Sequence, residues 1–158
     1  MMDPWFVANV RELPWLTNDA MGDCCVFEDD EHQFAQIGYT LAVFEPGTRG
    51  GRYHRELDNQ EDFLVLRGEC IAIVENEEHR LKQWDFLHCP PGVEHGFVGA
   101  GDGPCVLFCA GSRASRRIVY PRNELALSHG VGVEVETTVP AEAYADLPRW
   151  VPGVPLDL

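Results

Sequence analysis

The sequence predicts an all-β fold, a sandwich or barrel of short strands with short helical segments towards the C-terminus. Runs of β-branched, aromatic and other apolar residues recur at intervals of roughly 8–12 residues, which is typical of sandwiches and barrels. Turn-forming glycine, proline, asparagine and aspartate residues separate the runs. With 158 residues, of which 45% are hydrophobic, the chain is long enough to build one packed core.

Seven of these runs form the predicted barrel. They span residues 37–44, 63–66, 70–74, 79–81, 86–89, 93–98 and 105–110. Gly68 lies in the turn between the second and third runs, and Trp84 lies in the turn between the fourth and fifth. Pro90, Pro91 and Gly92 form a corner before the sixth run.

The barrel divides the chain into three expected parts. Residues 1–39, which are rich in large aromatic residues, are expected to form one or two outer strands that pack on the barrel of residues 40–112. Residues 113–158 are expected to form an extension whose short helices begin near Pro121 and Pro140, because proline suits the first helical position. Its proline-rich end is expected to be an extended arm that wraps its own barrel or crosses to a neighbouring subunit.

Charge and hydropathy exclude some classes of partner. The chain carries 26 acidic and 12 basic residues, a formal net charge of −14. Because nucleic acids and anionic membranes are bound through basic patches, we expect neither as a partner. No apolar stretch reaches the roughly 18 residues of a membrane helix, and no basic segment followed by an apolar run opens the sequence. A cytoplasmic location is the simplest expectation.

The six cysteines are not spaced as metal-binding knuckles. Cys24 and Cys25 are adjacent, so a disulfide between them would be strained. In a reducing cytosol the other four are expected to be small buried apolar residues in strands: Cys70, Cys89, Cys105 and Cys109. For Cys89 the alternative is a thiol that faces the predicted site, because Cys89 directly precedes Pro90 and lies close in sequence to His95.

Four residues with metal-binding side chains are spaced so that three strands can bring them together. They are His54, Glu56, Glu61 and His95. His54 and Glu56 are two residues apart and can face inward from one strand, while Glu61 begins the next strand. His95 follows the proline-glycine corner. Two imidazoles with one or two carboxylates suit a divalent ion of iron, manganese, nickel or zinc, with positions left for a substrate or water.

Each strand that carries a predicted ligand continues into apolar residues. Side chains two apart point to the same face, so Glu61 shares a face with Phe63 and Val65. By the same rule His95 shares a face with Phe97. These apolar side chains are therefore expected to line a pocket beneath the metal.

The spacing of these residues resembles the two motifs of the cupins, a family of small β-barrel proteins. The first motif appears as Gly47, His54, Glu56, Glu61 and Gly68, with one extra residue between Gly47 and His54. The second appears as Trp84, Pro90, Gly92, His95 and Gly99. Glu56 stands where the family usually has a second histidine, Trp84 where it has glycine, and Gly99 where it has asparagine.

The resemblance covers roughly residues 40–112 and implies a double-stranded β-helix, or jelly-roll, barrel. The chain has no internal repeat and is too short for the two-barrel arrangement of the family. Many cupins that resemble this chain are dimers, so a homodimer is expected.

Glu56 has two interpretations. As a fourth ligand, it would bring the charge of a site with a divalent ion near zero and favour manganese or iron. It would also be able to leave the metal and act as a catalytic general base. If Glu56 is turned away, His54, Glu61 and His95 form a two-histidine, one-carboxylate set, as in the facial triad of non-haem iron oxygenases.

Three classes of function fit the sequence. The first is a metal-dependent enzyme on a small oxygenated molecule, either a dioxygenase or a sugar-type isomerase or epimerase. The second is a non-catalytic cupin that binds a metal or small ligand, and the third is a metal-free structural barrel. A phosphorylated sugar would require basic residues at the barrel mouth, for which the candidates are Arg49, Arg52 and Arg55. A dioxygenase would show an apolar pocket, for which the candidates are Phe63, Phe86, Phe97 and Phe108.

Overall fold

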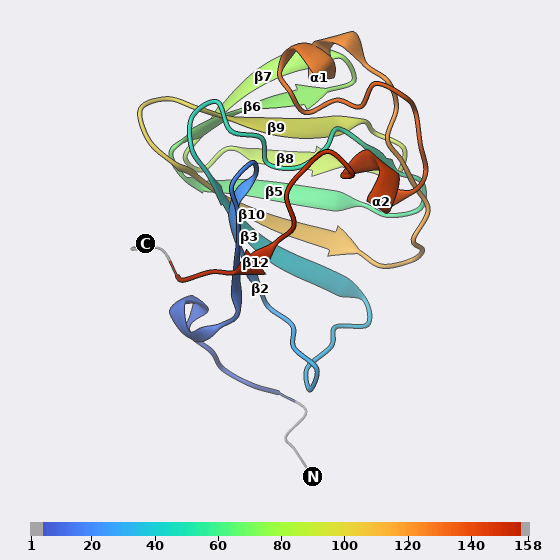
Figure 1. The fold of residues 1–158 in the computed structure, drawn as a ribbon. Coiled ribbons are helices and arrows are strands. Elements are labelled where there is room, and N and C mark those ends of the chain that lie inside the picture. Colours follow the sequence, from blue (N-terminus) through green and yellow to red (C-terminus); the bar gives the residue numbers. More distant parts are fainter. Residues whose placement is uncertain (1–4, 156–158) are drawn as a thin grey trace.

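The computed structural model describes residues 5–155, which form an all-β jelly roll with short helical segments (Figure 1). The elements in chain order are the 3-10 helix Val10–Glu12, β1 Trp15–Asn18, β2 Gly22–Val26, β3 Ile37–Phe44, β4 Arg55–Glu56, β5 Glu61–Arg67, β6 Glu69–Val74, β7 Glu77–Lys82, β8 Phe86–Cys89, β9 His95–Ala100, β10 Cys105–Ser112, β11 Ile118–Val119, α1 Glu124–Ser128, α2 Pro140–Ala143 and β12 Val151–Pro152. All seven runs predicted to build the barrel are strands, β3 and β5 to β10. The prediction of an all-β jelly roll is confirmed.

Two antiparallel sheets build the barrel. The larger has the strand order β12-β1-β2-β3-β10-β5-β8, and the smaller has the order β7-β6-β9. Residues 46–54 run beside β9 and extend the smaller sheet through isolated bridges that pair Pro46 with Gly99, Arg49 with Val98, and His54 with His95. This irregular strand carries the first predicted ligand to the strand that carries the last.

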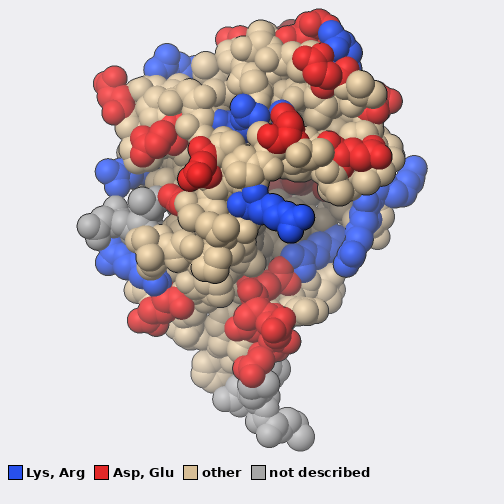
Figure 2. Space-filling model, viewed as in Figure 1, with Lys and Arg blue, Asp and Glu red and all other residues tan. Residues whose placement is uncertain are grey.

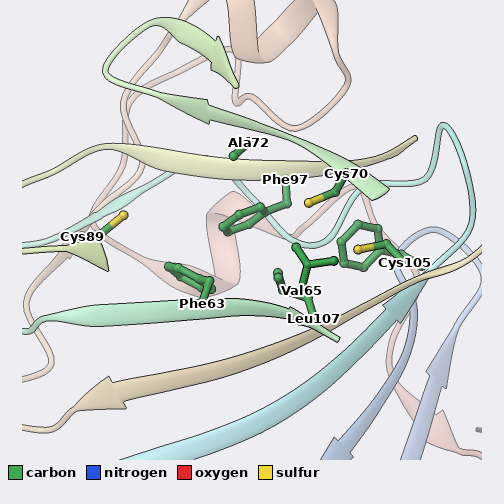
Figure 3. Packing of buried hydrophobic residues seen from close by; sticks show 9 residues of the cluster. Phe63, Val65, Cys70, Ala72, Cys89, Phe97, Cys105 and Leu107 are labelled. Atoms are coloured by element: carbon green, nitrogen blue, oxygen red, sulfur yellow. The ribbon is translucent and has the colours of Figure 1, made fainter. Parts of the chain in front are cut away.

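The main core fills the space between the two sheets. Figure 3 shows Phe63 and Val65 of β5 and Leu107 of β10 pointing toward Phe97 of β9. Ala72 of β6 adds to the core from the smaller sheet. Phe63, Val65 and Phe97 are thus buried on the inward faces, as the period-two pattern predicts.

Three of the four cysteines predicted to be buried strand residues have no more than 1% of their surface exposed: Cys70, Cys89 and Cys105. Cys109 is only partly buried and packs against the same core. A second cluster lies outside the main core, where Trp15 of β1 and Cys25 of β2 pack with Leu41, Val43 and Val106.

Two of the residues that depart from the cupin motifs lie at positions with a special backbone conformation or unusually close packing. Trp84, which stands in place of glycine, has a φ of 75° in the turn between β7 and β8, a conformation that costs most residues about 1–2 kcal/mol. Gly99, which stands in place of asparagine, lies so close to the crossing strand that a Cβ would be 2.1 Å from the backbone oxygen of Glu45. The close approach of residues 45–47 to β9 therefore requires glycine.

The C-terminal extension begins with helices at the predicted places and turns back onto the barrel. Asn123 caps α1 by accepting a hydrogen bond from the backbone N–H of Ala126, so the helix begins three residues after Pro121. Helix α2 begins at Pro140. The final strand, β12, pairs with β1 through Leu16 and Pro152. The extended arm therefore lies on the barrel of its own chain.

The surface is strongly acidic, as the composition requires. Figure 2 shows acidic side chains over the whole face in view, with a group gathered over the loop between β2 and β3. In residues 5–155 no helix is both long enough and apolar enough to cross a membrane.

Candidate metal centre

His54, Glu61 and His95 converge at one end of the barrel interior. His54 and His95 face each other across neighbouring strands, where each backbone N–H donates to the other residue's carbonyl, at 3.0 and 2.8 Å. Glu61 is the first residue of β5 in the opposing sheet. One potential ligand atom from each of the three residues lies within 4.8 Å of the others. Such a cluster has the size of a metal coordination sphere.

Hydrogen bonds orient both imidazoles so that their Nε2 atoms face Glu61. Nδ1 of His54 donates to the carbonyl of Arg52 at 2.7 Å, and Nδ1 of His95 donates to the carbonyl of Val93 at 3.1 Å. Each carbonyl can only accept, so the proton resides on Nδ1 and the Nε2 lone pair is available. The two Nε2 atoms lie 3.3 and 3.1 Å from Oε2 of Glu61. Backbone carbonyls that hold a histidine in this way are the usual outer partners of metal ligands.

The surroundings of the cluster change the pKa values of Glu61 and His54. Burial alone would raise the pKa of Glu61, but the hydrogen bonds and charges of the two imidazoles hold that pKa well below its usual range. Burial also acts to lower the pKa of His54, and the hydrogen bond and charge of Glu61 outweigh it, so that this pKa is raised. The carboxylate form of Glu61, which binds metals, is thus strongly favoured.

With each imidazole neutral and protonated on Nδ1, two atoms of the cluster have no hydrogen-bond partner within the described part of the chain, although they lie 3.1 Å from each other. They are Oε2 of Glu61 and Nε2 of His95, both with almost no surface exposed. Buried polar atoms are nearly always paired, because leaving one unpaired costs about 1–3 kcal/mol. Both atoms face the same point and both are good ligands for a divalent ion. The donor set therefore fits a metal ion held by His54, Glu61 and His95.

Glu56 lies beside this cluster and outside it. Its backbone pairs with Ile118 in the small sheet of β4 and β11. One carboxylate oxygen, Oε2, accepts a hydrogen bond from Nδ2 of Asn59 at 2.8 Å. Asn59 is itself buried and is fixed by Ser115, whose carbonyl accepts from Nδ2 and whose N–H donates to Oδ1. The structure thus brings together three of the four predicted ligands and turns the Glu56 carboxylate toward Asn59.

An inner cavity of about 340 Å³ opens from the cluster into the barrel. Phe63 and Phe97 line it, as expected from their places on β5 and β9, and their rings lie 4.6 Å apart. The other two phenylalanines considered for this pocket are elsewhere. Phe86 is 62% exposed on the edge strand β8, and Phe108 packs with the outer cluster. Phe86 and Phe108 lie outside the cavity for the same reason, because their side chains point to the outer face of the large sheet.

Cys89, the cysteine considered as a thiol that faces the site, is not one of the cysteines that line the inner cavity. Cys89 pairs with Glu61 across β5 and β8, but it is buried in the main core and is not among the residues that line the cavity. Cys24 and Cys109 line it instead. Burial raises the pKa of Cys24 to about 11 and also raises that of Cys109, so both are neutral thiols at pH 7.

The arginines expected at the barrel mouth are occupied elsewhere. Arg52 is 5% exposed, and its guanidinium donates to the carbonyls of Gly132 and Ala143 and to the carboxylate of Asp146. Arg55 donates to Glu94. Arg49 lies in a different pocket, lined by residues of the extension, and burial and the charge of Arg52 lower its pKa.

A larger groove of about 1130 Å³ lies on the other side of Glu61. Glu61 and Cys109 line both spaces, so the cluster stands where the groove meets the inner cavity. Glu56 and Asn59 line the groove. A molecule bound at the cluster therefore has an apolar space on one side and a polar space with a carboxylate on the other.

No local sequence pattern indicates a role in the site for three further residues. Asn59 has the amide that fixes Glu56. Tyr144 and Trp150 line the inner cavity from the extension, and no motif links them to ligands that lie 49 to 96 residues earlier in the chain. A period-two count along 37–44 does place Thr40, another lining residue, on the same face as Ala42 and Phe44.

The comparisons with known proteins agree with this architecture. Residues 40–111 match the family described as the cupin domain. The chain is 25% identical over 56 residues to an uncharacterized protein of Methanocaldococcus jannaschii. This match covers 35% of this chain and 45% of that protein. The chain thus aligns with less than half the length of that relative.

Two solved structures illustrate the similarity of fold. A sugar phosphate isomerase of the cupin superfamily from Silicibacter pomeroyi is similar with a TM-score of 0.59 and 18% identity, over 70% of this chain and 83% of that one. A predicted oxalate decarboxylase from Thermotoga maritima is similar with a TM-score of 0.60 and 16% identity, over 68% of this chain and 98% of that one. At these identities the likeness concerns the fold. Residues 40–111 thus match the cupin-domain family and fold as one jelly-roll barrel.

Proposed function

We propose that this cupin binds one divalent ion of iron, manganese, nickel or zinc through His54, Glu61 and His95, and that it acts as an enzyme on a small oxygenated molecule. The observation that carries the proposal is that two buried atoms, Oε2 of Glu61 and Nε2 of His95, face each other at 3.1 Å and are both acceptors while His95 is neutral and protonated on Nδ1. A purely structural barrel gains nothing from two such atoms, whereas a metal ion would satisfy both.

The ligand set favours dioxygenase-type chemistry. Two histidines and one carboxylate are the ligands of non-haem iron oxygenases, and three ligands leave positions of a six-coordinate ion for a substrate and dioxygen. When bound, the ion would polarise substrate oxygens and stabilise the negative charge that develops on them. The apolar rings of Phe63 and Phe97 would shield the bound molecule from water.

Glu56 is proposed as the general base. Its carboxylate lies in the groove beside the cluster and is fixed on one oxygen by Asn59. From there it would accept a proton from a substrate held at the ligands, a contribution of about 10²–10⁴ in rate. This observation also favours the second candidate function, a sugar-type isomerase or epimerase, in which a carboxylate moves a proton next to a polarised carbonyl.

Within the second candidate, a phosphorylated substrate is the less favoured occupant of the inner cavity. The neighbour from Silicibacter pomeroyi is a sugar phosphate isomerase, but a phosphate needs free cations. Arg52 is the arginine that lines the inner cavity, and all its donor groups point to the extension and Asp146. An unphosphorylated molecule therefore suits the inner cavity better.

The proposed partner is thus a small molecule and not a nucleic acid or a membrane, in keeping with the net charge of −14. A homodimer in the cytoplasm is part of the same proposal. Light scattering during gel filtration would test the dimer directly, because a mass near 17.7 kDa would correspond to a monomer.

Metal analysis by plasma mass spectrometry tests the metal centre. Untagged protein purified without chelators is expected to contain about one metal ion per chain. The ion should be lost from His54→Ala and kept in His88→Ala, because His88 is an exposed histidine paired with Asp62 outside the cluster. Wild-type protein that takes up none of the four metals on reconstitution would contradict the metal centre.

The metal found then directs the test of activity. Oxygen uptake by iron-loaded protein in the presence of small diols and oxo acids would support the dioxygenase type. Exchange of substrate C–H protons with deuterated water would support the isomerase type. Bound metal with neither activity across such panels would favour the non-catalytic binding cupin.

A further inference from the structure

The inner cavity is walled by parts of the chain outside the barrel motifs. Of its apolar lining residues, Phe63, Phe97 and Leu107 belong to the barrel, Leu16 and Met21 belong to the β1–β2 region, and Trp150 belongs to the C-terminal arm. In Figure 1 the arm passes in front of the barrel before it reaches β12. Segments near both ends of the chain thus contribute to the lining of the cavity.

The arm is anchored on both sides of Trp150. Before it, the carboxylate of Asp146 accepts a hydrogen bond from the buried guanidinium of Arg52, two residues ahead of His54 in the sequence. After it, the backbone N–H of Gly153 donates to the carbonyl of Trp15 at 2.9 Å. The carbonyl of Pro148 also accepts a hydrogen bond from the side chain of Asn18, which is 3% exposed. These contacts hold the backbone on both sides of Trp150, whose side chain lines the cavity and is 38% exposed.

The chemistry of the lining defines what the cavity can accept. Apart from the metal ligands, its charged and hydroxyl-bearing side chains are Asp23, Thr40, Arg52 and Tyr144. Arg52 is fully engaged, and the Tyr144 hydroxyl accepts from the N–H of Arg52 at 3.0 Å. A ligand with many hydroxyl groups would lose its hydrogen bonds to water against Phe63, Phe97 and Leu107. A cavity of about 340 Å³ has room for a six-membered ring, since apolar cavities of about 150 Å³ already bind benzene.

We propose that the substrate is a small molecule with an uncharged apolar body, a ring or branched chain of about six carbons, and an oxygen-bearing end. The body occupies the inner cavity against Trp150, which is a specificity-determining residue. The oxygen-bearing end lies at His54, Glu61 and His95, a part of the inference that rests on the proposed function. The same lining disfavours sugars and sugar phosphates as occupants of the inner cavity.

The first experiment compares cyclohexanol with myo-inositol, two six-membered rings of opposite polarity. Both are titrated into metal-free wild-type protein and followed by NMR, so the result does not depend on a metal. Cyclohexanol is expected to shift the signals of residues around the cavity and to bind at least about tenfold more tightly than myo-inositol, because it buries its ring carbons at no polar cost. Equal binding of the two, or binding of myo-inositol alone, would overturn the proposal.

The second experiment tests Trp150. Trp150→Ala is expected to weaken cyclohexanol binding about fivefold or more, because the ring loses one wall of its cavity. Trp150→Phe should retain binding within about twofold, and Trp84→Ala serves as the matched control because Trp84 is exposed in the β7–β8 turn. Wild-type affinity in folded Trp150→Ala would remove the role of Trp150.

These outcomes are separable from the failure of the metal centre. Cyclohexanol binding without metal uptake would retain the apolar cavity and reject the proposed enzyme. Metal uptake without preference for cyclohexanol would retain the metal centre and reject the substrate class.

Discussion

His54 and His95 form a directly opposed pair on neighbouring strands, in which each residue donates its backbone N–H to the other's carbonyl. Their rings lie 4.7 Å apart on the same side of the sheet, with Nε2 atoms directed at Glu61. The backbone pair fixes the positions of the two residues, and the side chains are left to form the cluster. The backbone atoms of His54 and His95 thus pair the two strands, and the side-chain atoms of the same residues are the proposed metal ligands.

This division predicts the effect of His54→Ala. Because the paired backbone groups remain, the variant should fold with a far-ultraviolet circular dichroism spectrum like that of the wild type. It should bind divalent metal at least about 100-fold more weakly, since a ligand is lost. Isothermal titration with manganese or zinc measures the affinity. A variant that folds and binds metal as the wild type does would place the ion elsewhere.

Glu56 and Glu61 are expected to differ when each is converted to its amide. Glu61→Gln should abolish metal binding, because it removes the charge between the two imidazoles. Glu56→Gln should change the metal affinity by less than about threefold, because the carboxylate is directed to Asn59, yet reduce activity about 100-fold or more as the base is lost. A large loss of metal affinity in Glu56→Gln would instead make Glu56 a fourth ligand.

At position 84 we expect the glycine variant to be more stable than the alanine variant, the reverse of the usual order. At a φ of 75°, Trp84→Ala keeps the unfavourable backbone conformation, whereas Trp84→Gly relieves it. The glycine variant should therefore be about 1 kcal/mol more stable than the alanine variant in urea unfolding. The opposite order, which holds at ordinary strand and helix positions, would show that the turn relaxes without glycine.

Alanine substitutions at Gly99 and Gly47 distinguish the stability cost of close packing from the stability cost of backbone conformation. A Cβ on Gly99 would meet the Glu45 carbonyl at 2.1 Å, so Gly99→Ala is expected to cost about 3 kcal/mol of unfolding free energy as the strands move apart. Gly47 has a φ of 78° and open space around it, so Gly47→Ala should cost only about 1 kcal/mol. Equal losses in the two variants would argue against the close approach at Gly99.

Acid should loosen the C-terminal arm through Asp146. Its hydrogen bond from Arg52 lowers the pKa of the Asp146 carboxyl. A lowered pKa in the folded state contributes stability above the unfolded value of about 3.9, and this contribution is lost as the pH falls through the folded pKa. Since Asp146 is 69% exposed, the effect is small and local. Tryptophan fluorescence of the arm should change below about pH 4 in the wild type.

Asp146→Asn is the control for this pH dependence. The amide does not titrate, so the variant should lack the part of the acid transition that belongs to the arm, while other carboxylates still titrate. Trp150→Phe identifies which part of the signal comes from Trp150. An identical pH profile in the wild type and Asp146→Asn would dissociate the arm from this ion pair.

Local patterns in the sequence are enough to predict the barrel strands and the ligand positions nearest to them. Period-two alternation in 61–65 and 95–97 fixes which side chains face inward, because a strand offers only two faces. The turns at Gly68 and Pro90–Gly92 fix where those strands begin. Local rules of this kind act over a few residues, so the sequence was sufficient to predict them.

The orientation of Glu56 and the lining of the cavity depend instead on contacts between distant segments of the chain. Glu56 satisfies the period-two rule with His54, yet a hydrogen bond from Asn59, itself fixed by Ser115 more than 50 residues away, turns its carboxylate into the groove. Arg52, a candidate for phosphate binding in the sequence, is instead buried against Asp146 and holds the arm that carries Trp150. Contacts between distant segments form only when the whole chain packs, and no local pattern records which partner a polar side chain will find there.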